Sequence, residues 1–159
     1  MKYRYLLIDN DNTLMDFHAA EHAALRETLT EAGIEPTDAV CARYSAINDA
    51  LWKALERGET THAALKITRF AQLLAEYPAK NVCAHRLALR YSHYLGTHAD
   101  LMPGAEAFLR RLHGQMKIVL VSNGDSVIQR NRLFRCVFTP LLDNIVTVSY
   151  THLRAHETK

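Results

Sequence analysis

Two short apolar runs that end in polar turns constrain the fold of this chain more than any other feature. The first, Tyr5–Ile8, leads directly into acidic and amide residues, and the second, Lys117–Ser122, ends in a turn that contains glycine. Short apolar runs bounded by such turns are typical of buried strands in a parallel sheet. Residues 143–148 have the composition of a third strand. The chain is therefore predicted to contain a parallel sheet.

The long segment between the first two runs has helical periodicity. From Phe17 to about Gly96, apolar residues recur at helical spacing, and glycine or proline marks the joints between about four successive helices. Short joints favour antiparallel neighbours, which predicts a small helical bundle. A helix that Pro103 opens precedes the second strand, and another helix over residues 126–135 follows it. This order predicts an α/β core with a helical insert between its first two strands.

The expected organisation has four parts. Residues 1–16 and 100–146 form the core, residues 17–99 form the helical insert, and residues 147–159 form a separate tail. A chain of 159 residues has room for one ordinary domain or for a small core that carries an insert.

Composition excludes several classes of protein. No apolar stretch approaches the roughly 18 residues of a membrane span, and the N-terminal apolar run is too short for a signal peptide. Three widely spaced cysteines (Cys41, Cys83 and Cys136) suit reduced thiols and argue against a cysteine-built metal site. A net charge of +2 with scattered basic residues does not favour nucleic-acid binding. We expect a cytoplasmic protein without nucleic-acid or membrane partners.

The turns after the first two strands carry complementary chemistry. Asp9 and Asp11 follow the first strand, whereas Ser122, Asn123 and Gly124 end the second. The carboxyl ends of parallel strands are where open α/β sheets bind ligands. A hydroxyl and backbone N–H groups suit an anion, and two carboxylates facing that anion require a cation such as Mg²⁺. The combination predicts phosphoryl chemistry with Mg²⁺.

Two motifs resemble those of the haloacid dehalogenase-like hydrolase superfamily. The stretch "DNDNTL" resembles its first motif, Asp-x-Asp-x-Thr, and "LVSNG" resembles its second. The resemblance implies that Asp9 is the nucleophile that forms an aspartyl-phosphate and that it binds Mg²⁺. It implies that Asp11 is the acid/base residue and gives Mg²⁺ a backbone carbonyl. It also implies phosphate contacts from the Ser122 hydroxyl and from the backbone N–H groups of Asn10, Asn123 and Gly124.

The resemblance extends to fold and activity. It implies a partial Rossmann-like parallel sheet with an inserted α-helical cap of the first cap class. Asp11 favours a phosphatase or phosphomutase over a dehalogenase, and Asn12 favours hydrolysis over mutase activity. The stretches "LWKALERGETTHAALKITRF" and "LMPGAEAFLRRL" resemble the pyrimidine 5′-nucleotidase branch that acts on noncanonical nucleotides. We therefore expect a Mg²⁺-dependent phosphohydrolase that acts on small phosphorylated substrates, namely nucleoside 5′-monophosphates.

Two further family motifs are missing from the sequence. They are a lysine in a Gly-x-x-Lys-Pro context and an acidic pair, Gly-Asp-x-x-x-x-Asp. The stretch "VSYTHLRAHET" can be back-translated into a string that resembles a transposon-end sequencing adapter. We therefore expect a C-terminally truncated fragment whose native sequence ends near Val146 and whose residues 147–159 have no function. Such a fragment would expose a sheet edge and an apolar face and would be poorly stable and nearly inactive, whereas the full-length parent would be the enzyme.

Two alternative functions remain. A phospho-receiver or phosphate-binding module would use the acidic turn without turnover, although a helical insert of this size argues against a receiver. The residues His18, Glu21 and His22 match the pattern H-x-x-E-H, which would suit a zinc peptidase. No further zinc ligand with supporting spacing follows in the sequence.

Two sets of side chains allow both a structural and a functional interpretation. The first could form a base-stacking wall but is more typical of bundle core: Trp52, Phe70, Tyr77, Tyr91 and Tyr94. The second could approach a phosphate but is more typical of a solvated helix face: Arg130, Arg132 and Arg135.

Overall fold

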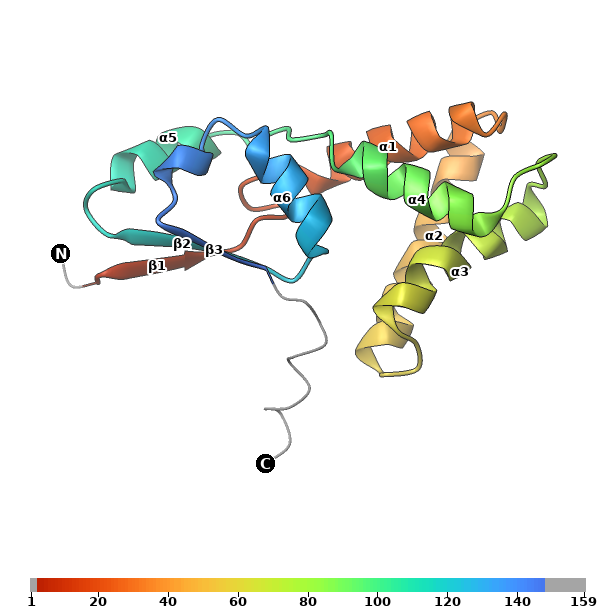
Figure 1. Ribbon diagram of the computed structural model, residues 1–159, viewed down its shortest axis with the longest axis horizontal. Coiled ribbons are helices and arrows are strands. Elements are labelled where there is room, and N and C mark those ends of the chain that lie inside the picture. Colours follow the sequence, from red (N-terminus) through yellow and green to blue (C-terminus); the bar gives the residue numbers. More distant parts are fainter. Residues whose placement is uncertain (1–2, 148–159) are drawn as a thin grey trace. The chain divides into compact units, whose positions relative to one another are not determined.

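The computed structural model describes residues 3–147, which form two compact units (Figure 1). The core unit consists of residues 3–21 and 96–147, and the helical unit consists of residues 22–95. The first helix, α1 (Phe17–Glu31), begins in the core unit and continues into the helical unit. Residues 148–159 of the expected tail lie outside the described residues.

Three parallel strands form the sheet of the core unit. They are β1 (Tyr5–Ile8), β2 (Lys117–Ser122) and β3 (Asn144–Thr147), in the order β1-β2-β3. Ile8 pairs with Leu120, and Ser122 pairs with Thr147. The carboxyl ends of β1 and β2 are therefore neighbours, as the sequence predicts.

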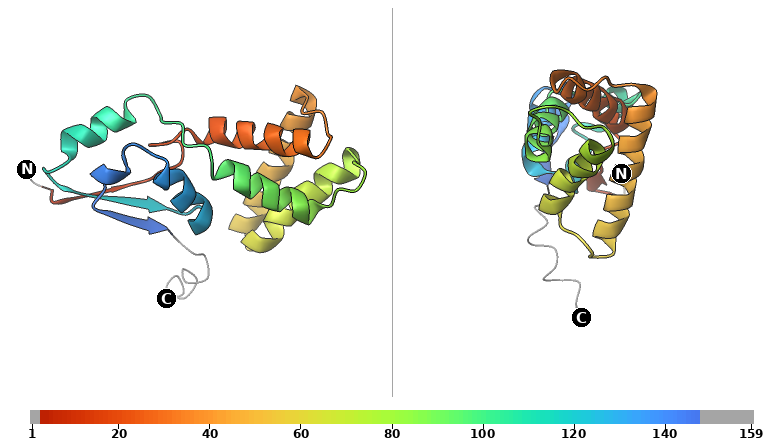
Figure 2. Two further views of the ribbon diagram at one scale, coloured as in Figure 1. Left: turned by 45° about the horizontal axis from the view of Figure 1, so that its top comes forward. Right: turned by 90° about the vertical axis from the view of Figure 1, so that its right-hand side faces the viewer.

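Two helices cover one face of the sheet. They are α5 (Ala105–Leu112) and α6 (Ser126–Phe134), and both lie on the same side of the strands (Figures 1 and 2). Strands that are added in one direction by right-handed crossovers place their connecting helices on a common face, which explains this arrangement. The short helix η1 (Thr139–Leu141) precedes β3. A buried cluster lies beneath these helices: Leu14, Met15, Ala105, Leu109, Ile118, Leu120, Leu133, Cys136 and Phe138.

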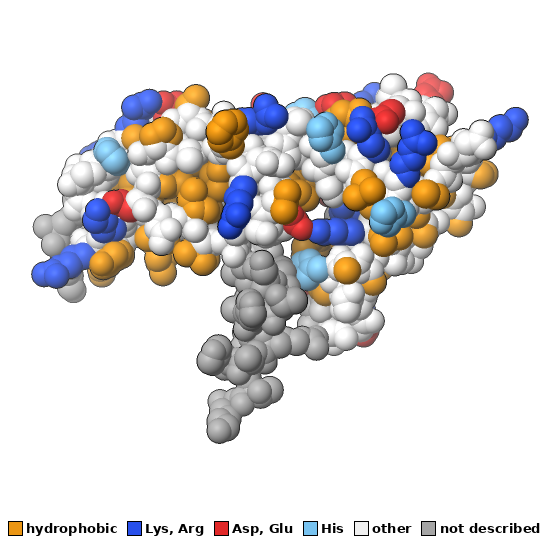
Figure 3. All heavy atoms as spheres, viewed as in Figure 1, with side chains coloured by type: hydrophobic (Ala, Val, Ile, Leu, Met, Phe, Trp, Pro, Cys, Tyr) orange, Lys and Arg blue, Asp and Glu red, His pale blue; other side chains and the backbone are white. Residues whose placement is uncertain are grey.

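The opposite face of the sheet is open among the described residues. Side chains alternate between the two faces of a strand, and in β1 those of Tyr5 and Leu7 are 67% and 69% exposed. Figure 3 shows hydrophobic side chains along this lower side of the strands. The expectation that Tyr5–Ile8 is a buried strand is therefore wrong: Tyr5 and Leu7 are exposed, and Leu6 and Ile8 are only partly buried. An apolar run indicates that a strand can be buried, whereas its actual burial depends on whether helices or other segments cover each face of the sheet.

Four helices build the helical unit. After α1 come α2 (Asp38–Glu56), α3 (His62–Glu76) and α4 (Ala84–Leu95); α2 packs on α3, and α3 packs on α4. The Thr37 hydroxyl caps α2 by accepting a hydrogen bond from the N–H of Val40, and Thr61 caps α3 in the same way through Ala64. The predicted helices are therefore confirmed.

Two expectations from composition concern membrane-spanning helices and the state of the cysteines. None of its helices has both the length and the apolar character to cross a bilayer. Cys41 and Cys136 are buried, Cys83 is exposed, and all three are free thiols.

Candidate active site at the carboxyl ends of the strands

The loop after β1 folds tightly around one carbonyl group. The backbone oxygen of Asn10 accepts hydrogen bonds from the N–H groups of Thr13, Leu14 and Met15 at 3.3, 2.9 and 3.0 Å. The N–H of Asn12 donates to the oxygen of Met15 at 2.7 Å. These bonds satisfy the buried backbone and fix the turn that carries Asp9 and Asp11.

Asn12 gives this turn its shape and also bonds the first turn of α1. Its φ is 58°, a left-handed conformation that asparagine tolerates better than most residues other than glycine. Its side-chain oxygen accepts hydrogen bonds from the N–H groups of Phe17 and His18 at 3.1 and 3.3 Å. The positive φ explains why asparagine suits this position, and the bonds to α1 give its side chain a second role.

Asp9 lies immediately after β1 with an exposed side chain. Its Oδ2 lies 3.5 Å from the hydroxyl of Thr13, which is at the limit of hydrogen bonding. No ion pair with Asp9 occurs in the described part of the chain. The carboxylate is thus sterically accessible and not neutralised by a protein cation.

Asp11 is held quite differently, by two side chains of α6. Arg132 Nη1 donates to its Oδ1 and Gln129 Nε2 donates to its Oδ2, both at 2.5 Å. The Arg132 side chain is fully buried, and that of Asp11 is 21% exposed. We call the side chains of Gln129 and Arg132 the Asp11 clamp.

The sequence reasoning missed this clamp. Placing Arg132 on a solvated helix face is wrong, whereas Arg130 and Arg135 are exposed as expected. One signal was available: Gln129, Arg132, Leu133 and Cys136 follow the i, i+3, i+4, i+7 spacing of an inward helix face. Two of these inward positions are polar, so hydrophobic periodicity alone does not mark them.

The turn after β2 lies against the clamp. Ser122 is buried, and its Oγ accepts a hydrogen bond from the N–H of Gly124 at 3.1 Å, whereas Asn123 is exposed. Asp125 then caps α6 through the N–H groups of Val127 and Ile128 at 3.0 and 3.1 Å. A Cβ atom on Gly124 would lie 2.5 Å from Gln129 Nε2, so glycine permits this close approach.

Asn10 joins the same network through its side chain. It is fully buried, and its Nδ2 donates to Gln129 Oε1 at 2.7 Å. The structure thus brings the predicted residues Asn10, Asp11 and Gly124 together around Gln129. The side chains of Asp9 and Asn123, which are next to this network in the sequence, are exposed.

The turn after β1 offers oxygen atoms of the kind that a hard cation binds, although the set is small. Mg²⁺ prefers oxygen ligands and commonly uses one or two carboxylates together with a substrate phosphate. The Asp9 carboxylate is open, and the backbone carbonyl of Asp11 accepts no hydrogen bond from the described residues. The side chain of Asp11 is already engaged by the clamp. Asp9 and the Asp11 carbonyl therefore fit Mg²⁺ better than the two carboxylates together.

The described residues do not provide a set of zinc ligands around His18 and His22. His18 and His22 are both exposed on α1, and the ring of His18 lies 3.3 Å from the side-chain amide of Asn12. Across residues 3–147, no group of three or more His, Cys, Asp and Glu side chains is placed to hold a metal ion.

Three of the six aromatic residues of the helical unit lie in its core, whereas Trp52, Tyr77 and Tyr94 are only half-buried. The ring centroids of Tyr44, Phe70 and Tyr91 lie 5.3–5.8 Å apart, and all three side chains are buried. Trp52 is half-buried, with its ring edge-on to His62 at 5.3 Å. The core interpretation is therefore confirmed for Phe70 and Tyr91, which do not form a base-stacking wall.

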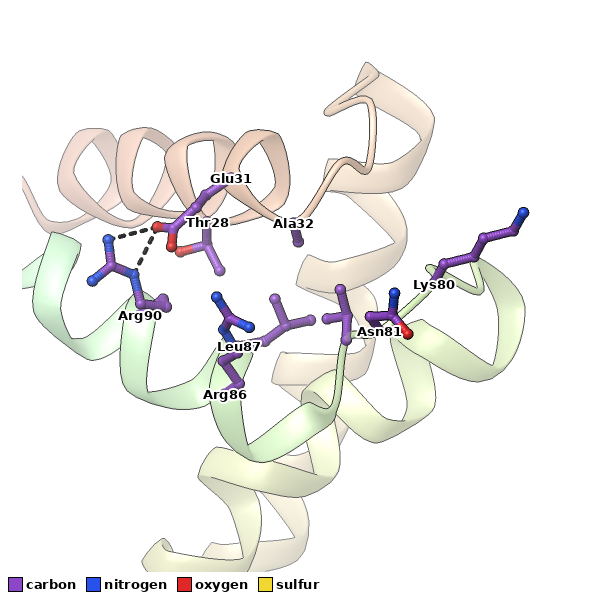
Figure 4. Close-up of a pocket in the computed structure, with 9 residues that line it drawn as sticks. Thr28, Glu31, Ala32, Lys80, Asn81, Arg86, Leu87 and Arg90 are labelled. Atoms are coloured by element: carbon purple, nitrogen blue, oxygen red, sulfur yellow. Dashed lines mark hydrogen bonds and ion pairs between the residues drawn. The ribbon is translucent and has the colours of Figure 1, made fainter.

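A separate pocket of about 210 Å³ lies within the helical unit (Figure 4). Its lining includes Glu31, Arg86 and Arg90. Tyr94 and Arg90 donate hydrogen bonds to Glu31 Oε2, both at 2.7 Å, and these bonds hold the pKa of Glu31 below its ordinary value. Glu31 thus neutralises one of the basic groups of this pocket, which contains none of the predicted site residues.

Comparison with known proteins decides the family. A profile of the haloacid dehalogenase-like hydrolases matches residues 3–155. The chain belongs to this family. The Rossmann-like α/β core with an inserted helical cap, which the sequence predicts, is the fold of these hydrolases.

Two individual relatives are similar to this chain over most of its length. YfnB of Bacillus subtilis is 38% identical over 132 residues, which are 83% of this chain and 56% of YfnB. The pyrimidine 5′-nucleotidase PynA of Streptococcus pneumoniae is 34% identical over 146 residues, which are 91% of this chain and 61% of PynA. The chain thus spans less than two thirds of the length of either relative.

A solved structure has a similar fold. The crystal structure of YfnB bound to magnesium has a TM-score of 0.87 and 35% identity to this chain, covering 92% of this chain and 64% of YfnB. Membership of a hydrolase family with a nucleotidase relative supports a phosphatase-like enzyme.

Proposed function

We propose that the whole protein is a Mg²⁺-dependent phosphohydrolase that acts on nucleoside 5′-monophosphates through an aspartyl-phosphate on Asp9. The observation that carries this proposal is the contrast between two neighbouring carboxylates. Asp9 is exposed and unpaired, as a nucleophile requires, whereas Asp11 is held in place beside it by α6. Family membership supports hydrolysis, and PynA supports a nucleotide substrate.

The proposed reaction has two steps. In the first, an oxygen of the Asp9 carboxylate attacks phosphorus and the bond to the nucleoside 5′-oxygen breaks. Asp11, which must enter this step as the protonated carboxyl group, gives that oxygen its proton and is left as a carboxylate. In the second, Asp11 takes a proton from a water molecule, which attacks the aspartyl-phosphate and releases inorganic phosphate. An acid/base residue of this kind contributes about 10²–10⁴-fold to the rate.

The remaining site residues would hold the phosphoryl group. The Ser122 hydroxyl accepts a hydrogen bond from Gly124, so its own O–H stays available to donate to a phosphoryl oxygen. The backbone N–H groups of Asn10 and Asn123 would complete the anion site, and that of Gly124 would join them by leaving the Ser122 hydroxyl. Asp9 and the carbonyl of Asp11 would hold Mg²⁺, which neutralises phosphate charge when it is bound.

The test measures phosphate release from a panel of purine and pyrimidine nucleoside 5′-monophosphates, with and without Mg²⁺. It uses the protein expressed from its complete reading frame, with Asp9→Asn as the matched variant. We expect turnover of at least one nucleotide and a loss of at least about 10³-fold in kcat for Asp9→Asn, because the amide is a poor nucleophile. Full activity in the variant would contradict the proposal. Stable phosphorylation of Asp9 without phosphate release would favour the receiver instead.

A further inference from the structure

The two oxygens of Asp11 receive their hydrogen bonds from one helix. Arg132 and Gln129 are 0% and 2% exposed, and they lie on the inward face of α6. Each carboxylate oxygen has about two acceptor positions, of which the clamp uses one. Since the Asp11 side chain remains 21% exposed, its orientation is restrained while one side stays accessible.

The clamp is itself fixed by further contacts. Arg132 Nε donates to the backbone oxygen of His98 at 2.9 Å, and its guanidinium lies 5.7 Å from the centre of the Phe17 ring. Gln129 accepts from Asn10 and packs against Gly124 where any side chain would intrude. Side chains restrained in this way can hold a partner in one geometry, which productive proton transfer requires.

A purely stabilising role explains this arrangement less well. Buried ion pairs add little to stability compared with well-packed apolar groups. This pair also leaves two buried atoms, Arg132 Nη2 and Asn10 Oδ1, without a hydrogen-bond partner among the described residues. The network therefore carries a cost that an apolar contact at the same place would avoid.

We propose that Gln129 and Arg132 are positioning residues for the acid/base step, and that Gly124 is glycine because Gln129 must reach Asp11. This inference rests on the proposed function, in which Asp11 protonates the leaving group. It links α6, which begins just after the phosphate-binding turn, to proton transfer at the turn after β1.

The test compares substrates that differ in their need for a proton. A nucleoside alkoxide must be protonated as it leaves, whereas 2,4-dinitrophenolate leaves without help. Single-turnover phosphorylation of Asp9 is therefore measured with a nucleoside 5′-monophosphate and with 2,4-dinitrophenyl phosphate. The variants are Arg132→Met and Gln129→Leu, with Arg132→Lys as the conservative change and the exposed Arg130→Met as the matched control.

The expected result is a selective loss. Arg132→Met should lower the rate with the nucleotide about 10²-fold, and Gln129→Leu about tenfold, because Asp11 supplies up to that order of acceleration. Both variants should change the rate with dinitrophenyl phosphate by less than about threefold. Arg132→Lys should recover part of the loss, and Arg130→Met should show none.

Other results would overturn the inference in distinguishable ways. Equal losses with both substrates, or no loss, would make the clamp structural and leave the proposed function intact. A wild-type protein inactive on both substrates would overturn the proposed function and the inference with it. If Arg132→Met fails to fold, Gly124→Ala keeps the ion pair and should resemble Gln129→Leu. In a protein that already carries Gln129→Ala, Gly124→Ala should cause no additional loss of rate with the nucleotide. If the two changes instead lower this rate independently, the inference is overturned.

Discussion

Each of the two units contains a buried arginine among its described residues, and the two positive charges are stabilised in different ways. In the core unit, Arg132 is fully buried and pairs with the carboxylate of Asp11. In the helical unit, Arg69 is 6% exposed, and its Nη1 donates to the neutral side-chain oxygen of Asn48 at 3.2 Å. The Arg69 guanidinium also lies 4.4 Å from the centre of the Tyr91 ring.

The difference shows how a buried charge can be used. Arg69 lies among aromatic rings that stabilise a cation through their faces, so it contributes to the packing of the bundle. Arg132 instead pairs with a residue from the turn after β1, which makes its charge part of the candidate site. A buried arginine therefore indicates function only when its partner is itself placed to react.

The largest effect on stability should come from removing the carboxylate in the core unit. Asp11→Ala would leave the Arg132 guanidinium buried without a counter-charge, which costs about 3–5 kcal/mol. Asp9→Ala is the matched control, because its exposed carboxylate has no charged partner and should change stability by less than about 0.5 kcal/mol. Urea denaturation measures both. Equal, small losses in the two variants would show that the Asp11–Arg132 pair does not hold in solution.

A smaller effect is expected in the helical unit. Arg69→Met keeps most of the apolar volume and loses one hydrogen bond and the contact with the Tyr91 ring, so we expect a loss of about 1–2 kcal/mol. Arg69→Lys should be no better, since an ammonium group is more strongly hydrated and lacks the planar face that stacks. Urea denaturation followed by Trp52 fluorescence reports this unit. A loss as large as that of Asp11→Ala would break the comparison, because it would mean that Arg69 depends on a specific counter-charge.

The smallest expected effect is a loss of thermal stability at acidic pH. Hydrogen bonds from Tyr94 and Arg90 lower the pKa of Glu31, a bond from Arg43 lowers that of Glu76, and one from Lys117 lowers that of Asp143. A carboxyl group with a lowered folded-state pKa stabilises the protein above its unfolded pKa, about 4, and loses this contribution as pH falls through its folded value. The melting temperature should therefore fall modestly between about pH 5 and pH 3.

Two of these three carboxylates belong to the helical unit, so the acid response should be clearest there. The variant with Glu31→Gln and Glu76→Gln should flatten the pH dependence seen by Trp52 fluorescence, and Asp143→Asn should leave that signal nearly unchanged. An unaltered slope in the double variant would show that the exposed pairs with Arg90 and Arg43 are screened by solvent.

Local pattern predicted most of the architecture. The helical spacing of residues 17–96 and the polar turns after β1 and β2 are short-range signals, and the structure confirms the elements that they predict. The burial of β1 was overestimated because it depends on layers that the strand's own residues do not encode. The Asp11 clamp was missed for a related reason: Asp11 and Arg132 are 121 positions apart, and only the assembled sheet and helix bring them together.

The arrangement of the two units in the sequence has a consequence for the order of folding. Residues 22–95 are continuous, whereas Tyr5 must pair with Lys117 across the whole of that segment. Contacts between residues distant in sequence form slowly, because a long loop must close before they gain anything. During synthesis the helical unit can therefore assemble before β2 is available to pair with β1. The turn after β1 is then among the last parts of the chain to take its final shape.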